Sequence, residues 1–189
     1  MPDIRTPLPD CGRLVGLFDA LFAEAENTRL VPGGREPLYL PADADCRHHR
    51  IVFRDDFVAS ALHEVAHWCI AGAQRRLLVD FGYWYCPDGR DEKQQRAFEQ
   101  SEARPQALEW IFSTSARLGF RPSLDNLSEG ASDGSAFAVA IAREARRYCE
   151  RGLPSRAERF RRALVHEFGG ALELNPADYR LDRLRGNGA

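Results

Sequence analysis

The sequence predicts an α+β fold with a single domain, residues 1–189, in which a metal-binding helix packs on a small sheet and further helices surround both. Apolar residues recur every three or four positions in several segments, which is typical of helices with one buried face. Short runs of β-favoured residues between the first two helical segments indicate strands. An HExxH pentapeptide lies inside the second helical segment. Because a chain of this length can bury a core without a structural metal, a metal bound there would serve a function.

The first half of the chain is expected to contain a helix, two strands and the motif helix. Leucines and phenylalanines at helical spacing predict the first helix over residues 12–26. A Pro-Gly-Gly break at 32–34 ends the segment that follows. Short strands are then expected at 37–40 and 50–53, directly before the motif helix.

The second half begins with a predicted strand over 77–86, where valine, phenylalanine, tyrosine and tryptophan gather before a Pro-Asp-Gly turn. Helical character returns over 91–117, and Pro105 is expected to begin or kink a segment there. Two arginine-rich helices are predicted at 136–151 and 155–168. A solvated helix face is the simpler interpretation of their charge than a partner-binding surface.

Two segments are expected to pack loosely. Residues 123–135 are rich in Ser, Asp, Asn and Gly, which predicts a loop or a mobile lid. Residues 169–189 are expected to form a flexible tail.

Composition excludes several classes of protein. The chain has no apolar run near 18 residues and no N-terminal signal-like segment, so we expect a cytoplasmic protein without membrane contact. Five cysteines without a C-x-x-C pair argue against a disulfide framework and against a four-cysteine zinc site. The formal net charge of −2 gives no drive toward direct nucleic-acid binding, although 25 of the 26 basic residues are arginine.

The pentapeptide His63-Glu64-Val65-Ala66-His67 is the strongest functional signal in the chain. Side chains four residues apart lie on one helix face, so the two imidazoles could bind one metal ion. Glu64 is turned about 100° away and could reach a metal-bound water. The motif is typical of zinc proteases, in which this glutamate is the general base. Two imidazoles with a carboxylate equally describe the iron site of non-haem oxygenases.

An open catalytic metal site needs a third protein ligand, and a carboxylate is expected. The metzincin extension of HExxH is absent, because Ile70 and Ala73 stand where that class has glycine and histidine. The next helical segment instead offers four glutamates: Glu92, Glu99, Glu102 and Glu109. Glu102 is preferred on position, since the 35 residues after His67 leave room for a strand, a turn and an antiparallel return, and Glu99 stays as the alternative.

The segment 80–91 combines aromatic and acidic residues and is the second unusual feature of the chain. Part of it is expected to be core packing. Aromatic rings rimmed by carboxylates can also hold a cationic side chain, and a lysine-like substrate would fit. The candidate substrate-binding residues are Asp80, Tyr83, Trp84, Tyr85, Asp88 and Asp91.

Six segments within the first 125 residues together carry a resemblance to one known family: residues 27–30, 39–44, 50–53, 63–72, 79–91 and 105–108. They resemble the bacterial elongation factor P hydroxylases. The unbroken run 79–91 is far more specific than HExxH alone, and the C-terminal third matches only loosely.

This resemblance implies oxygen-dependent hydroxylation of one lysine of elongation factor P, a lysine that already carries a β-lysyl group. It implies a zincin-like fold rather than the double-stranded β-helix of 2-oxoglutarate oxygenases. The family's two-histidine, one-carboxylate motif would fall on His63, His67 and Glu102. The role of Glu64 stays open in this interpretation: it is the candidate catalytic residue, and it could orient a ligand or a bound water. Imidazole and carboxylate ligands suit Fe(II), with dioxygen as co-substrate. No 2-oxoglutarate motif is recognised, so the source of the two electrons stays open.

Two rival hypotheses remain from the sequence. The first is a zinc metallopeptidase in which Glu64 activates a metal-bound water. The second is a noncatalytic module that docks on translation factors through its arginine-rich helices. The second leaves the histidine pair unexplained.

Overall fold

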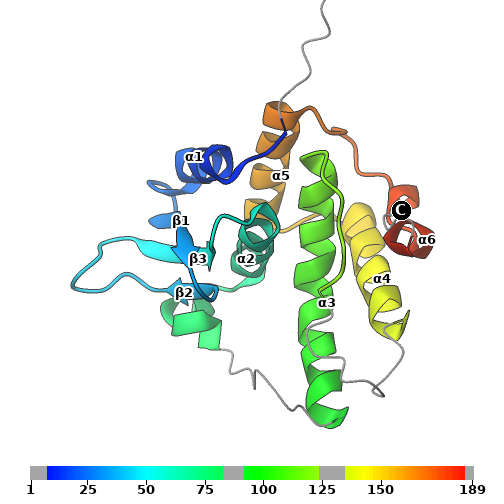
Figure 1. Cartoon of the computed structure of the whole chain (residues 1–189), viewed down its shortest axis with the longest axis horizontal. Helices are drawn as coiled ribbons and strands as arrows, with labels where there is room; N and C mark the ends of the chain where they lie inside the picture. The colour runs from blue at the N-terminus through cyan, green and yellow to red at the C-terminus, as the bar shows by residue number, and fades with distance from the viewer. Residues whose placement is uncertain (1–7, 83–91, 124–134, 186–189) are drawn as a thin grey trace, which may run out of the picture.

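A computed structural model describes residues 8–82, 92–123 and 135–185, and it confirms the α+β class. The elements are α1 (Cys11–Phe22), β1 (Thr28–Gly34), β2 (Leu38–Leu40), β3 (His49–Arg54), α2 (Val58–Ile70), η1 (Arg75–Leu77), η2 (Val79–Gly82), α3 (Glu92–Ser115), α4 (Ser135–Arg151), α5 (Ser155–Phe168), η3 (Pro176–Asp178) and α6 (Leu181–Arg185). Figure 1 shows the sheet at one side, α2 between the sheet and α3, and α4 on the far side of α3. The single-domain organisation stays a prediction.

The sheet has three strands in the order β1-β3-β2. β3 pairs with β1 in parallel and with β2 antiparallel, so Ile51 lies between Leu30 and Tyr39. The strands predicted at 37–40 and 50–53 are therefore confirmed, with slightly different ends. The sequence does not predict β1, because Pro32-Gly33-Gly34 at its end is typical of a break in the chain. Proline and glycine are tolerated there because β1 is an edge strand and its register shifts after Val31.

The motif helix α2 is anchored through its apolar side. Trp68 is fully buried, and the rings of Phe18 and Phe22 from α1 meet it edge-on at 5.2 and 4.9 Å between centroids. Phe160 from α5 packs against Phe18 at 6.0 Å. This aromatic cluster holds α2 in one position between α1, α5 and the sheet.

The strand predicted over 77–86 is wrong for the part that the structure describes. Residues 75–82 form the two short turns η1 and η2, and Asp80 and Phe81 both have positive φ angles of 48° and 56°. Phe81 stacks on Tyr39 at 4.2 Å, and the backbone N–H of Tyr39 donates to Asp80 Oδ1 at 2.8 Å. Asp80 thus occupies a hydrogen-bonding position on β2 that another strand would otherwise fill.

The helix predicted at 91–117 is present as α3, Glu92–Ser115, and Pro105 lies inside it rather than at its start. The two helices predicted after it are confirmed as α4 and α5. The predicted lid at 123–135 lies almost wholly outside the described residues.

The solvated-face interpretation is wrong for two arginines of α5. Arg156 Nη2 donates to the carbonyl oxygens of Trp68, Cys69 and Ala71 at 3.0, 3.3 and 2.6 Å, and its guanidinium lies 4.7 Å from the Trp68 ring centroid. These carbonyls end α2 and have no partner further along the helix, so Arg156 caps the motif helix from outside. Arg161 is 3% exposed.

The segment from Gly169 onward, expected as a flexible tail, contains η3 and α6. Tyr179 is buried, and its ring meets Trp110 of α3 edge-on at 5.1 Å between centroids. Residues 186–189 lie outside the described part.

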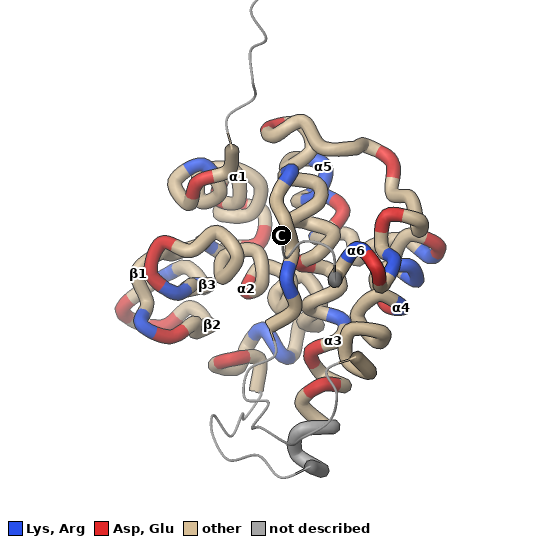
Figure 2. Tube along the Cα trace, turned by 45° about the vertical axis from the view of Figure 1, so that its right-hand side comes forward, with Lys and Arg blue, Asp and Glu red and all other residues tan. Residues whose placement is uncertain are grey.

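Charged residues of both signs are spread over the elements rather than gathered by sign, as the view in Figure 2 shows. This distribution agrees with a formal net charge of −2. Among the described residues, every helix is too short or too polar to cross a bilayer.

Candidate metal centre

Two packed helices bring three potential metal ligands together. His63 and His67 lie one turn apart on α2, and Glu102 lies on α3, which packs against α2. His63 Nε2 lies 3.0 Å from His67 Nε2 and 3.5 Å from Glu102 Oε2, and His67 Nε2 lies 3.3 Å from Glu102 Oε1. Their ligand atoms lie within 4.8 Å of one another, and this is the one such group in the described part of the chain.

These separations fit the binding of a single divalent ion. Two atoms that each lie about 2.1 Å from one ion are about 3.0 Å apart at an angle of 90° and about 3.4 Å apart at a tetrahedral angle. The three distances fall in or close to that interval. The donor set of two imidazoles and one carboxylate suits zinc or iron. His63, His67 and Glu102 could therefore hold a metal ion with little movement.

Glu109 supports this cluster in a way that the sequence did not reveal. Its Oε2 lies 2.8 Å from His63 Nδ1, so that ring nitrogen donates to the carboxylate and Nε2 faces the site. The sequence placed Glu109 only among the candidates for third ligand. The available signal was its spacing, since seven residues after Glu102 make two helical turns and place both carboxylates on one face of α3.

The carboxylates around His63 make it a strong base. Burial acts to lower its pKa, but the hydrogen bond and charge of Glu109, with the charges of Glu64 and Glu102, raise the pKa to about 10. In the absence of a cation the cluster therefore retains a proton at neutral pH. A divalent ion would displace that proton, so metal binding would release it.

Glu64 lies within electrostatic reach of the cluster without joining the ligand group. Burial raises the pKa of its carboxyl, and the charges of His63 and His67 oppose that rise. This arrangement is compatible with a group that holds a proton or a water beside the metal.

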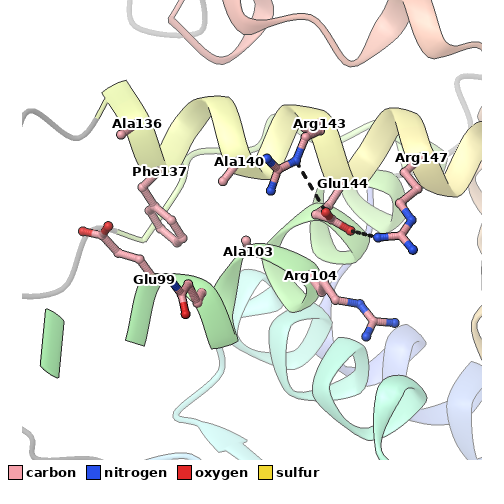
Figure 3. Close-up of a pocket in the computed structure, with 10 residues that line it drawn as sticks. Glu99, Ala103, Arg104, Ala136, Phe137, Ala140, Arg143, Glu144 and Arg147 are labelled. Atoms are coloured by element: carbon pink, nitrogen blue, oxygen red, sulfur yellow. Dashed lines mark ion pairs between the residues drawn. The ribbon is translucent and has the colours of Figure 1, made fainter. Parts of the chain in front are cut away.

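The two glutamates that the sequence offers as third ligand, Glu102 and Glu99, lie in different surroundings. Glu102, 3% exposed, meets both histidines. Glu99 lies one turn earlier on α3 and lines a cavity between α3 and α4 instead (Figure 3).

Of the six predicted substrate-binding residues, one is described. Asp80 accepts a hydrogen bond from the Tyr39 backbone, and its charge also raises the pKa of Glu64, so it lies in reach of the metal cluster. The other five are outside the described residues: Tyr83, Trp84, Tyr85, Asp88 and Asp91. The substrate role of all six stays a prediction.

An α+β fold with a two-histidine, one-glutamate cluster on packed helices defines a protein that could hold a metal ion. The family model for "Elongation factor P hydroxylase" matches residues 17–179, and the chain belongs to that family. The match runs from α1 to beyond η3, so it includes the C-terminal third, where the sequence resemblance was loose.

One curated relative is the "Elongation factor P lysine hydroxylase" of Haemophilus influenzae. It is 47% identical to this chain over 166 residues, which cover 88% of this chain and 93% of the relative. The relative and this chain therefore correspond over nearly their whole lengths.

Proposed function

We propose that this chain hydroxylates a lysine side chain of elongation factor P, one that already carries a β-lysyl group, with dioxygen and a metal ion held by His63, His67 and Glu102. The observation that carries the proposal is that potential ligand atoms of these three side chains lie within 4.8 Å of one another. Membership of the hydroxylase family and the printed name of the relative support the substrate. Since translation factors act in the cytoplasm, the reaction is expected there.

Fe(II) is the proposed ion. When bound, it would supply the redox chemistry that lets dioxygen oxidise a C–H bond without haem. Three ligands from two adjacent helices leave other coordination positions open. The overall reaction inserts one oxygen atom into a C–H bond and reduces the other to water. It therefore consumes two electrons and two protons from an external reductant.

The protein's own groups fix the ligands and their protons. Glu109 accepts a hydrogen bond from His63 Nδ1–H, which keeps that imidazole in the tautomer with a free Nε2 lone pair. Glu102 is almost fully buried, so the charge of a bound metal would compensate a carboxylate that is otherwise costly to desolvate.

The electrostatics of the cluster favour a cationic substrate. Glu64, Glu102 and Glu109 bring three carboxyl groups to the site, and burial raises the pKa of Glu64. A lysine-type ammonium beside Glu64 would favour the charged form of that carboxyl and pair with it. The site must hold the reacting carbon close to the metal, and an ionic contact with the substrate ammonium would fix that position.

The zinc metallopeptidase hypothesis uses the same histidines with Glu64 as general base. The geometry at His63 and His67 serves either reaction, so the family membership is what favours hydroxylation. The noncatalytic docking hypothesis gives no reason for a metal-ready cluster.

One experiment separates the three functions. The purified protein is loaded anaerobically with Fe(II) and mixed with β-lysylated elongation factor P, ascorbate and air, and the modified peptide is weighed. We expect a gain of one oxygen atom, abolished in His63→Ala and His67→Ala. Cleavage of the substrate by the zinc-loaded protein would instead establish the peptidase, and binding without any mass change would establish the docking module.

A further inference from the structure

A separate cavity lies where α3, the end of α4 and the start of α5 meet. Its volume is about 240 Å³, and it is lined by Arg104, Glu144, Arg147, Tyr148, Arg151 and the turn Gly152–Pro154. We call it the arginine–tyrosine pocket. Three guanidinium groups face one carboxylate in it.

The single carboxylate neutralises only part of this charge. Glu144 lies 3.6 Å from Arg147 and also 3.6 Å from Arg143, which is outside the pocket. Within the described part of the chain, Arg104 and Arg151 form no ion pair with a carboxylate. The pocket therefore carries a net positive charge. Figure 3 shows Arg104 from α3 and Arg147 from α4 on the same side of Glu144.

Tyr148 gives a second, independent indication of a ligand. Tyr148 is 8% exposed, and its buried hydroxyl lies beside the donor Arg104 but has no acceptor for its own proton among the described residues. Burial raises the pKa of this hydroxyl and Arg104 opposes the rise, so at neutral pH the group is a protonated donor. Buried donors without an acceptor are rare because each one is costly. An anion in the pocket would accept from Tyr148 and pair with the arginines at once.

Arg104 lines both this pocket and a second cavity that His67 also lines. This second cavity has a volume of about 200 Å³, and Gln100, Ser101 and Pro105 line it too. Among the residues that the structure describes, none that lines that cavity is acidic, whereas the metal cluster includes the carboxylate of Glu102. A protein that presents a cationic side chain to the metal would thus place its neighbouring surface over Arg104 and the arginine–tyrosine pocket.

We propose that the arginine–tyrosine pocket binds a carboxylate side chain of the protein substrate while the target lysine reaches the metal centre. The proposal rests on the proposed function and assigns a second anchor point to the same substrate. One acidic group in the pocket and one ammonium at the metal would fix the orientation of the partner by two contacts of opposite sign.

The test compares Tyr148→Phe and Arg104→Met with the wild-type protein in the hydroxylation assay. Tyr148→Phe keeps the ring and removes only the donor. Since a hydrogen bond to a charged group is lost, we expect KM for elongation factor P to rise about tenfold or more, with kcat and bound metal unchanged. Arg143→Met is the matched control, because it also approaches Glu144 but lies outside the pocket, and its KM should stay at the wild-type value.

A binding measurement keeps this test independent of the proposed reaction. Titration calorimetry of the metal-free protein with elongation factor P should show the same losses of affinity, even if no hydroxylation occurs. Inorganic phosphate should compete with elongation factor P for the wild-type protein and much less for Arg104→Met. Unchanged affinity and KM in both pocket variants would overturn the proposal. So would phosphate binding that leaves elongation factor P binding unaffected, since the pocket would then serve a free anion.

Discussion

Removal of the Glu109 carboxylate should weaken metal binding without unfolding the protein. Glu109 Oε2 lies 2.8 Å from His63 Nδ1, and its side chain is only 9% exposed, so water screens this contact poorly. A hydrogen bond to a charged group in such a place contributes about 1.5–3 kcal/mol. Mutation of a residue that orients a metal ligand in this way typically weakens metal binding by about 10–100-fold. We therefore expect Glu109→Ala to raise the metal Kd by about 10–100-fold.

Glu109→Gln refines the same test. Its amide oxygen can still accept from His63 Nδ1 but carries no charge, so we expect a smaller loss than in Glu109→Ala. The assay is competition for Zn²⁺ and, anaerobically, for Fe(II) against a fluorescent chelator at fixed pH, with circular dichroism to confirm folding. Glu99→Gln is the control on the same helix, since Glu99 lines the cavity between α3 and α4. Equal Kd values for Glu109→Ala and wild type, or an equal loss in Glu99→Gln, would refute the reasoning.

Three further predictions follow from other contacts. Glu102→Ala should lose bound metal, measured by mass spectrometry of the metal content, while remaining folded; retained metal would mean that another carboxylate is the third ligand. Arg156→Met should lower the free energy of unfolding, measured in urea, by about 1.5–3 kcal/mol, because three carbonyls at the end of α2 lose a charged donor. Arg159→Met is the control, because Arg159 donates to a single exposed carbonyl, that of Leu21, and it should lower the free energy of unfolding by less; an equal loss in both variants would contradict the prediction. Hydrogen bonds from Arg161 lower the pKa of Glu158, so their stabilisation should be present above the ordinary carboxyl pKa and lost as pH falls through the lowered value. Glu158→Gln should cost about 1–2 kcal/mol at pH 7, the range for charged hydrogen bonds that are partly exposed to water. The cost should shrink as pH falls through the lowered pKa, and a cost that does not change with pH would contradict this.

Local sequence patterns were sufficient for most helices. α2, α4 and α5 follow from apolar residues at helical spacing, because the buried face of a helix repeats every 3.6 residues whatever it packs against. The histidine pair follows from the same periodicity. Glu102 needed an argument from chain length, and that argument gave the residue that the structure brings to the histidines.

The predictions were wrong for elements whose conformation depends on residues far away in the sequence. β1 contains proline and glycine, and only its edge position beside β3 makes it a strand. Residues 77–82 have strand-like composition, yet Phe81 stacks on Tyr39 and Asp80 binds the Tyr39 backbone, which requires turns with positive φ. Composition carries no information about such a contact, because its two sides lie about forty residues apart.

By itself, the sequence determined the α+β class, the family resemblance and the two histidines on one helix face. The tertiary structure decided the rest of the site: Glu102 rather than Glu99 beside the histidines, Glu109 behind His63, and Arg156 at the end of the motif helix. The physical reason is the separation in sequence of the residues that interact. A helical repeat depends on residues three or four positions apart, whereas the metal-binding cluster depends on how α2, α3 and α5 pack, and that packing is a property of the whole core.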